Sequence, residues 1–540
     1  MKIIGFFPNG FQIIFGLLLL ISCGESEQNS RDHLVFRYNE HGNIPTLDPA
    51  FARNLQIIWT TNQLYNGLVQ LDDSLNIIPD IAKNWSIDDS THTYTFYLRD
   101  DVYFHKNKVF KNYPDSTRVV TAHDFVYSFD RLTDENVASP GSWIMSNIHT
   151  YEAINDTTFS IQLTKPFPAF LGLLSMRYCS VVPKEAVDYY GNDFRRNPVG
   201  TGPFQFQMWE ENVKLVLRKN PLYFEKDTDG NSLPYLEAVA ITFLPDKQSE
   251  FLQFAQGKLD FISGLDNSYK DEILTTDGKL QAKYQEDFKL VTGPFLNTEY
   301  LGIYLPTPKS EIQNKEFRQA INYGFDRHQM VKYLRNGMGI PAVHGFIPKG
   351  LSGHSEIEGY TYNPEKARQL IETYKRASGN SQPQITIGTS GNYLDIVEFI
   401  QRELEKLGIA VTIDVMPPST LRQMRSSGEI DIFRASWIAD YPDAENYLSL
   451  FYSPNFAPNG PNYVHFKNEV YDSLYTKALT RSAIDERKEL YTKMDSIIVA
   501  EAPVIPLFYD MAVRFVNKKV DGLGINPQNF LVLKHVRKVP

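Results

Sequence analysis

The sequence predicts an α/β protein that is divided into two or three lobes. Three observations lead to this prediction: a length of 540 residues, short β-rich segments in the N-terminal half, and alternating helices and strands in the C-terminal half. A single hydrophobic core rarely extends beyond about 250–300 residues, so this length requires more than one core. The composition, with 42% hydrophobic and 22% charged residues, is that of a globular protein.

Several segments of the N-terminal half have the pattern of half-buried strands. Residues 93–99 alternate and are rich in Thr, Tyr and Phe, which favour strands. The same pattern predicts strands at residues 34–38, 158–163, 214–218 and 239–244.

Helix signals followed by strand signals mark the C-terminal half. Asn363 is a suitable N-cap and Pro364 suits the first helical position, so a helix is expected to begin there. Residues 393–407 predict another helix, which Gly408 ends, and residues 409–415 predict the strand that follows. This alternation indicates helices packed on a sheet.

Gly- and Pro-rich segments interrupt these patterns at three places. They are candidates for points where the chain passes from one lobe to another. The segments are residues 200–204, 291–294 and 501–506.

Residues 1–22 predict a lipoprotein signal peptide. Lys2 precedes an apolar run that is too short to cross a bilayer of about 30 Å comfortably. The run ends in Leu-Ile-Ser-Cys, which resembles a bacterial lipobox and would make Cys23 the lipidated first residue of the mature chain. Residues 23–32 are polar and predict a flexible tether. We therefore expect a protein on the periplasmic or cell-surface side of a bacterial membrane, lipid-anchored at Cys23; an ordinary signal peptide is the alternative.

Charge and motifs argue against two classes of protein. The net charge of −10 disfavours a nucleic-acid binder, whose surface would be basic. No Gly-x-Ser-x-Gly, His-Glu-x-x-His, Walker or dinucleotide-binding motif occurs, so no catalytic residue, metal site or cofactor is predicted. Gly200-Thr201-Gly202 is half of a phosphate loop, and Pro203 removes a backbone donor that a phosphate would need. We expect that the protein is not an enzyme.

Two weaker signals have ordinary structural explanations. Residues 226–231 resemble part of a calcium loop, but the order of ligands is broken and no Glu closes the loop. A solvated turn is expected there, and whether Asp227 and Asp229 bind calcium stays open. Cys179 lies in an apolar neighbourhood and is expected to be a buried structural thiol.

Residues 425–452 carry the strongest functional signal. A predicted strand runs through Arg434 and leads to Trp437 and a Pro turn, and this segment carries four acids, which are Asp431, Asp440, Asp443 and Glu445. The α-amino group of a peptide is a cation with three donors, so a carboxylate in a poorly hydrated cleft is its natural partner. The carboxylate of a peptide needs Arg or Lys, and its backbone can pair with a strand edge. The alternative is a buried strand followed by a solvated acidic loop.

Residues 434–448 read Arg-Ala-Ser-Trp-Ile-Ala-Asp-Tyr-Pro-Asp-Ala-Glu-Asn-Tyr-Leu. This segment resembles the signature of the oligopeptide- and dipeptide-binding proteins of ABC importers, the solute-binding proteins of family 5. The likeness covers nearly the whole mature chain. Further matching blocks, in chain order, are residues 46–49, 65–69, 94–100, 121–128, 200–204 and 317–327.

The resemblance implies a periplasmic-binding-protein-like α/β fold of class II, type C. Two large lobes joined by a hinge would close on the ligand, and a third lobe would be inserted. Lobe I would comprise residues 33–70, 196–292 and 503–540, the inserted lobe II residues 71–195, and lobe III residues 293–502.

The resemblance also implies which residues bind the ligand. Asp440 would pair with the α-amino group of a peptide, while Ser436, Trp437 and Ile438 would offer backbone groups and an aromatic wall. Further residues expected to line the site are Arg425, Arg434 and Tyr509.

Two features depart from the pattern of the family. Arg53 stands about where a peptide binder of this family can carry a Glu that contacts the ligand. Residues 389–392 lack the His that can meet longer peptides. The length and the identity of the ligand therefore stay open.

The expected function is that of an extracytoplasmic solute-binding protein of an ABC importer. It would capture short peptides in a closing cleft and deliver them to the permease subunits in the membrane, working as a monomer without nucleic acid. A binder of a metal complex, haem or a saccharide is the alternative. A lipid-anchored hydrolase that uses paired acids such as Asp440 and Asp443 is a second alternative.

Overall fold

The computed structural model describes residues 34–351, 353–481 and 483–539. The expected signal peptide, the lipidation site at Cys23 and the tether lie outside the described residues. No helix in the described part of the chain is both long and apolar enough to span a membrane.

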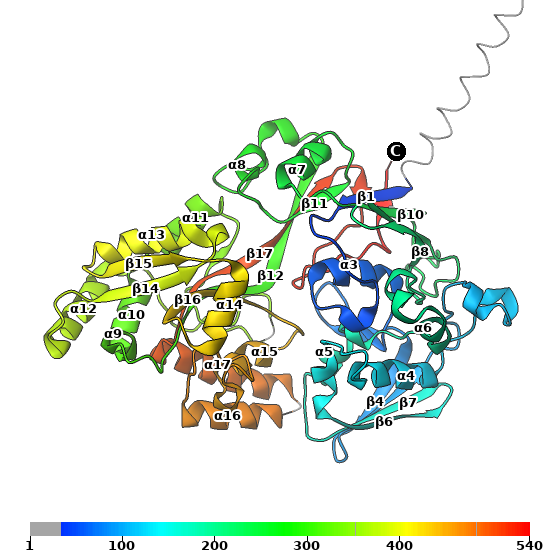
Figure 1. Cartoon of the computed structure of the whole chain (residues 1–540), viewed down its shortest axis with the longest axis horizontal. Helices are drawn as coiled ribbons and strands as arrows, with labels where there is room; N and C mark the ends of the chain where they lie inside the picture. The colour runs from blue at the N-terminus through cyan, green and yellow to red at the C-terminus, as the bar shows by residue number, and fades with distance from the viewer. Residues whose placement is uncertain (1–33, 352, 482, 540) are drawn as a thin grey trace, which may run out of the picture.

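The first lobe is built on a four-stranded sheet, shown on the right of Figure 1. Its order is β1-β10-β9-β8, in which β1 and β10 are parallel and the other pairs are antiparallel. The C-terminal tail packs on this lobe, because Trp59 Nε1 donates to the carbonyl of Asn529 at 2.8 Å. The elements are β1 (Val35–Asn39), α3 (Leu55–Leu64), β8 (Phe204–Glu210), β9 (Lys214–Lys219), β10 (Ala238–Thr242), β18 (Val520–Asp521) and β19 (Arg537–Lys538).

A second, antiparallel sheet lies below the first in Figure 1 and has the order β4-β5-β7-β6. One face of β5 is buried through Tyr94, Phe96 and Leu98, as its alternating sequence requires. The strands of this sheet are β4 (Ala82–Asp88), β5 (Thr93–Leu98), β6 (Ile148–Asn155) and β7 (Thr158–Leu163). The same part of the chain contains the separate hairpin of β2 (Val69–Leu71) and β3 (Ile77–Pro79) and the helices α4 (Ala122–Thr133), α5 (Phe170–Leu174) and α6 (Lys184–Tyr190).

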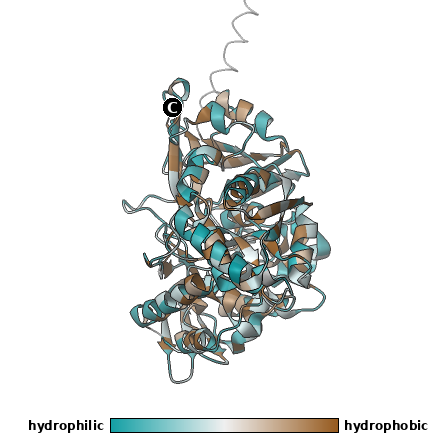
Figure 2. Cartoon of the chain, turned by 90° about the vertical axis from the view of Figure 1, so that its left-hand side faces the viewer, coloured by the Kyte–Doolittle hydropathy of each residue, from teal (hydrophilic) through white to brown (hydrophobic). Residues whose placement is uncertain are grey.

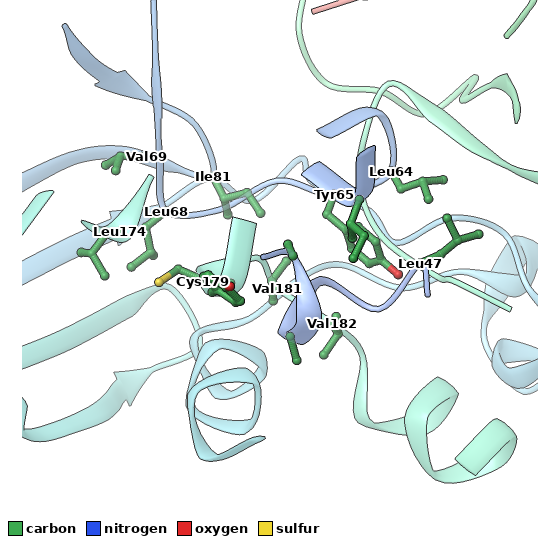
Figure 3. Close-up of a cluster of buried hydrophobic side chains, with 14 of the residues drawn as sticks. Leu47, Leu64, Tyr65, Leu68, Val69, Ile81, Leu174, Cys179, Val181 and Val182 are labelled. Carbon is green, nitrogen blue, oxygen red and sulfur yellow. The ribbon is translucent and has the colours of Figure 1, made fainter. Parts of the chain in front are cut away.

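One hydrophobic core joins these two sheets. It includes Phe36 of β1, Leu64 of α3, Phe96 of β5 and Cys179, all of which are fully buried or nearly so. Figure 3 shows the part of this core in which Cys179 lies among Leu68 and Leu174. Because the two sheets share a core, we treat them as one body, which we call the N-terminal body.

The third and largest sheet has seven strands and lies on the left of Figure 1. Its main path is β11-β17-β12-β16-β14-β15, and β13 pairs with β17. The strands are β11 (Phe261–Ser263), β12 (Phe288–Ile303), β13 (Ile340–Pro341), β14 (Gln384–Thr389), β15 (Ala410–Val415), β16 (Ile432–Ile438) and β17 (Val504–Asn517).

Helices cover both faces of the large sheet, and we call this unit the C-terminal body. Figure 2 views it from the left-hand side of Figure 1 and shows helices that carry both hydrophilic and hydrophobic residues. One core lies under α10 (Lys315–Tyr323), α11 (Arg327–Leu334), α12 (Pro364–Ser378) and α13 (Leu394–Glu405). The other lies under α14 (Pro418–Ser427), α15 (Glu445–Leu448), α16 (Glu469–Leu479) and α17 (Ile484–Glu501).

The strands and helices expected from the sequence are confirmed. The five predicted strands of the N-terminal half are β1, β5, β7, β9 and β10, and the predicted helices and strand of the C-terminal half are α12, α13 and β15. Asn363 caps α12 by accepting from the backbone N–H of Lys366 at 2.9 Å.

The two long strands β12 and β17 connect the two bodies. They pair from Phe288 to Pro294, and the pairing resumes at Thr298 after a shift of register. The expected break at residues 291–294 is therefore a break in register inside one strand, because Pro294 lacks the N–H that a regular ladder would use. Two short helices lie near this connection (Figure 1), α7 (Lys247–Ala255) and α8 (Lys270–Ile273), whereas α9 (Ser310–Gln313) packs against α10 in the C-terminal body.

The Gly200-Thr201-Gly202 segment packs against the end of α3. A Cβ on Gly200 would lie 2.1 Å from the carbonyl oxygen of Leu64, and one on Gly202 would lie 2.5 Å from that of Gln63. The N–H of Gly202 donates to Leu64 at 2.9 Å. Close contact between two backbones explains both glycines.

Candidate functional site

A cavity with a volume of about 590 Å³ lies between the two bodies. Such a volume suits a small-molecule ligand, since ligand pockets commonly measure about 300–1,000 Å³. Several separate parts of the chain line it: residues 39–41, most of residues 52–59, residues 176–178, Lys247 and Glu250, residues 261–264, residues 438–440 and residues 528–530. A ligand bound in this cavity can therefore contact both bodies.

Asp440 reaches this cavity because it follows directly after β16. The N–H of Ala439 donates to Leu296 at 2.9 Å, and this bond extends the pairing of the strand. Asn446 then fixes the turn, since its Oδ1 accepts from the N–H of Asp440 at 3.2 Å and from Trp437 Nε1 at 2.8 Å. Across the cavity, Gln528 Nε2 donates to the carbonyl of Asp440 at 3.3 Å.

The carboxylate of Asp440 is nearly unpartnered. It lines the cavity, and its closest hydrogen bond is a long one of 3.5 Å from Asn446 Nδ2. Desolvation by the surrounding protein raises the pKa of this carboxyl, and the contact with Asn446 opposes the rise. An exposed carboxylate that faces a cavity without an ionic partner favours a cationic or hydrogen-bond-donating ligand group.

The other acids of the turn are used within the protein. Asp443 accepts from Tyr491 Oη at 2.7 Å and pairs with Arg487 at 3.0 Å. Glu445 accepts from the hydroxyls of Tyr441 and Tyr475. Asp431 lies at the other end of the strand and pairs with Lys309 at 2.5 Å. Because Asp443 is turned into the core, it does not form a pair with Asp440 across the cavity, which disfavours the proposed paired-acid hydrolase.

Tyr441 holds the turn against the N-terminal body. Its ring is 6% exposed and belongs to the core of that body, although the residue follows β16 of the other body. It meets Phe167 edge to face at 6.1 Å, and it lies beside Gly172, where a Cβ would be 3.4 Å from Tyr441 Cβ. The turn that carries Asp440 therefore also bridges the two bodies.

Arg53 lies on the wall of the cavity formed by the N-terminal body. It precedes Asn54, whose side chain caps α3 by accepting from Ile57 at 3.1 Å. Arg53 is exposed. Its guanidinium forms no ion pair and donates no hydrogen bond to any described residue. Tyr178 lines the cavity near both charges: burial and Asp440 raise its pKa to about 12, and Arg53 opposes the rise.

Glu40 also lines this cavity, although the sequence does not predict it as a site residue. It is 4% exposed, and its Oε1 has no hydrogen-bond partner. Burial, followed by the charge of Glu250, raises its pKa to about 8, so Glu40 carries a proton at neutral pH. Lys247 pairs with Glu250 at 2.7 Å beside it. Only the tertiary structure brings these residues together, and no local pattern around Glu40 signals it.

The other expected site residues differ in how exposed they are and in whether they line the cavity. Ile438 lines the cavity and is 43% exposed. Ser436 and Trp437 are half-buried on β16, where Trp437 packs toward the core under α14–α17. None of Ser436, Trp437, Arg434, Arg425 and Tyr509 is among the residues that line the cavity in this conformation.

Three of these residues already have partners in the protein. Arg434 pairs with Glu299 and stands 3.3 Å above the ring of Tyr393. Arg425 stands 4.4 Å above the ring of Tyr463. Tyr509 is 1% exposed, and its hydroxyl donates to the carbonyl of Gly345 at 2.9 Å. Their expected contacts with a ligand stay predictions.

The segment that resembles a calcium loop forms a closed turn. The carboxylate of Asp227 accepts from the N–H of Asp229 at 2.9 Å, from Asn231 at 2.8 Å and from Tyr235 Oη at 2.5 Å. Within the described residues there is no cluster of three or more acidic, His or Cys side chains suited to a metal ion.

An α/β fold of two bodies that are joined by two strands and enclose a charged cavity defines a hinged solute-binding protein. The comparison with known families agrees. The sequence profile of the bacterial extracellular solute-binding proteins, family 5 Middle, matches residues 76–459. The chain belongs to this family, and the expected α/β, periplasmic-binding-protein-like fold class is confirmed.

Individual relatives extend the likeness over nearly the full length. The glutathione-binding protein GsiB of Salmonella typhi is 26% identical over 494 residues, which cover 90% of this chain and 91% of the relative. Heme-binding protein A of Haemophilus influenzae is 27% identical over 490 residues, with 87% and 85% covered. The periplasmic binding protein DppA of Helicobacter pylori, solved with the peptide STSA, is 26% identical with a TM-score of 0.76, and the match covers 95% of this chain and all of that one. The named relatives are binding proteins.

Proposed function

We propose that this chain captures short peptides for an ABC importer and hands them to the membrane permease. The observation that carries the proposal is the carboxylate of Asp440, which faces the cavity with only a 3.5 Å contact while the other acids of its turn are paired. A free α-amino group would give this carboxylate the charged donor that it lacks. The relatives named for glutathione and solved with a peptide support the same class of ligand.

Different site residues are proposed for different tasks. Asp440, Ile438 and Arg53 would touch the ligand, since all three line the cavity. Trp437 would position Asp440 through the shared Asn446, and Ser436 would complete the strand that leads to it. Arg434, Arg425 and Tyr509 would stabilise the framework of the C-terminal body through their partners.

The proposed mode of action is closure of the two bodies around the ligand. Residues 33–70, 196–292 and 503–540 would form lobe I, residues 71–195 lobe II and residues 293–502 lobe III. The two sheets of the N-terminal body would move together because they share a core. Strands β11 and β17, which these bounds assign to lobe I, belong to the large sheet of the C-terminal body. A ligand that touches both sides of the cavity favours the closed form by its differential affinity.

We also propose that the protein is tethered by a lipid on Cys23. Metabolic labelling with a fatty acid in a bacterial host should label the native chain and leave a Cys23→Ser variant unlabelled. Label that persists in Cys23→Ser would refute the anchor.

Calorimetry of Asp440→Asn tests the proposed peptide site. The probes are di- and tripeptides with a free amino terminus, together with their N-acetylated forms. They include peptides whose first peptide bond uses the α-carboxyl and peptides whose first peptide bond uses a side-chain carboxyl. Loss of the charge should weaken binding by about tenfold or more, since a charged hydrogen bond contributes about 1.5–3 kcal/mol. The exposed Asp414 of β15 offers a matched control, Asp414→Asn, which should bind as the native chain does. Equal affinity of Asp440→Asn and the native chain would contradict the role of Asp440.

The non-peptide alternative is tested separately by mass spectrometry of the gently purified protein. Heme-binding protein A is among the relatives, so haem, metal complexes and saccharides belong in the search. A retained peptide supports the proposal. A retained haem, metal complex or sugar, with no binding of any peptide in calorimetry, rejects it.

A further inference from the structure

Residues 526–530, near the C-terminus, are held by the N-terminal body, and we call them the strap. Trp59 Nε1 donates to the carbonyl of Asn529 at 2.8 Å. Arg514 Nη2 donates to the side-chain oxygen of Asn529 at 3.0 Å. Leu531, which directly follows the strap, is fully buried in the core of the N-terminal body. The strap is therefore expected to move with this body.

The strap also forms a backbone hydrogen bond with the hinge, at the break in β12. The register of β12 and β17 shifts between Pro294 and Thr298, so no residue of β17 pairs with residues 295–297 in register. The N–H of Leu296 donates instead to the carbonyl of Pro527 at 2.7 Å. The strap thereby satisfies a backbone donor that the two connecting strands leave unpaired with each other.

The next residue of the strap reaches the turn that follows β16. Gln528 Nε2 donates to the carbonyl of Asp440 at 3.3 Å, and both residues line the cavity. Gln528 is 4% exposed, and its Oε1 has no hydrogen-bond partner among the described residues. Because Asp440 follows a strand of the C-terminal body, opening of the cavity would pull this bond apart. The bond from Leu296 to Pro527 lies at the hinge itself and can persist.

We propose that the strap is a latch, in which Pro527 attaches the strap to the hinge and Gln528 holds the turn of Asp440 while the bodies are together. Gln528 is then a positioning residue that favours the closed form before a ligand enters. The inference rests on the proposed closure of the two bodies. It adds a preference for the closed form that does not depend on the identity of the ligand.

One hydrogen bond is enough to influence such an equilibrium. The net contribution of a neutral hydrogen bond corresponds to about a two- to tenfold change in an equilibrium constant. The open and closed forms of a hinged protein commonly differ by a small free energy, so a change of this size alters their populations measurably. A much stronger latch would hinder the release of the ligand.

Distances between spin labels test the latch without any peptide. Ile154→Cys on β6 and Val470→Cys on α16 place labels on exposed residues of the two bodies, at the lower edge of Figure 1 and away from the β12–β17 connection. The labels are attached in a Cys23→Ser background, in which the remaining native thiol, that of Cys179, is buried. Gln528→Met removes the donor at similar size, and it should raise the ratio of long to short distances about two- to tenfold.

Two further variants make the result specific. Gln528→Asn keeps an amide but is one methylene shorter, so it should lose the bond to Asp440 and open the protein as Gln528→Met does. Gln369→Met replaces an exposed glutamine of α12 and should leave the distances as in the native chain.

The same labels separate the latch from closure itself. Native distances in both Gln528 variants, together with shorter distances when a peptide binds the native chain, overturn the latch and leave the proposed closure intact. If no bound peptide shortens the distances in the native chain, the proposed closure fails and the latch fails with it.

Discussion

At the scale of single residues, one acid of the turn after β16 is distinguished from its neighbours by its surroundings. Asp443 and Glu445 accept hydrogen bonds from tyrosines and are buried, whereas Asp440 faces the cavity. All three are carboxylates within six residues of sequence, so composition does not separate them. Their different partners give them different chemistry.

The raised pKa of Asp440 predicts how ligand affinity depends on pH. The carboxyl loses its charge as the pH falls through a pKa above the usual range, while the amino group of the ligand stays protonated. Affinity should therefore fall as the pH is lowered from neutral through the raised pKa of this carboxyl. Calorimetry over this range measures it, and Asp440→Asn should show a much flatter profile. A native profile as flat as that of the variant would contradict the prediction.

Glu40 predicts a pH-dependent stability. Its folded pKa of about 8 lies above the value of 4.5 for an exposed Glu, so the folded state keeps a proton that the unfolded state releases. The stability that this proton provides is present below the unfolded pKa and is lost as the pH rises toward 8. Glu40→Gln imitates the neutral form and should stabilise the protein by about 1–3 kcal/mol at pH 8, with little effect at pH 5.

Thermal unfolding of the native protein and of Glu40→Gln at pH 5 and pH 8 measures the difference in stability between the two proteins. Other buried acids with raised pKa values, such as Asp495, affect both proteins equally and cancel. A difference that is the same at pH 5 and pH 8 would count against the protonated state of Glu40.

Cys179 should be inert in the folded protein. The side chain is fully buried, and burial raises the pKa of its thiol to about 12, so almost no thiolate is present at pH 8. Maleimide labelling followed by peptide mass spectrometry should find Cys179 unmodified in the native protein and modified after unfolding. Rapid labelling of the native protein would show that the core around it opens.

At the scale of elements, the turn between β16 and α15 has two tasks. It presents Asp440 to the cavity and places Tyr441 in the core of the N-terminal body. Tyr441 is already packed beside Phe167 in this structure. Because Asp440 and Tyr441 are adjacent, we expect a ligand held by Asp440 to stabilise this contact and so to favour the closed form.

Tyr441→Ala tests this coupling. Loss of a buried aromatic side chain commonly costs about 3–5 kcal/mol, and here much of that cost falls on the contact between the bodies. The variant should favour the open form and bind ligand about tenfold or more weakly. Tyr441→Phe keeps the ring and loses only the hydrogen bond to Glu445, so it should remain near native affinity. Native affinity in Tyr441→Ala would remove the turn from the closure mechanism.

At the scale of the whole molecule, two rigid bodies are connected by β12 and β17, whose pairing shifts register between Pro294 and Thr298. A shift of this kind weakens the ladder locally and suits a hinge. The shared core of the first two sheets predicts that closure moves the C-terminal body against the other two sheets together.

Small-angle X-ray scattering measures this closure. Addition of a peptide that binds should reduce the radius of gyration of the native protein, because the bodies approach each other around the cavity. Asp440→Asn at the same peptide concentration should show a smaller change. An unchanged radius at saturation would exclude closure by the hinge.

Most helices and strands, and the class of the protein, follow from signals that are already present in the sequence. Strands such as β7 follow from an alternating pattern, and α12 follows from its N-cap and first-turn proline, because these signals act between neighbouring residues. The ordered blocks that resemble the family placed the chain in the right class, and Asp440 was singled out from that resemblance.

Which charged side chains lack an ionic partner depends instead on contacts between distant parts of the chain. Asp443 is neutralised by Arg487, which follows 44 residues later, and Arg434 by Glu299, which precedes it by 135 residues. Glu40 meets the charges of Glu250 and Lys247 in the wall of the same cavity. Local patterns specify backbone conformation, but the availability of a charge depends on partners that packing brings from distant parts of the chain. For that reason the sequence identifies a solute-binding protein, whereas the cavity distinguishes the groups that a ligand can reach.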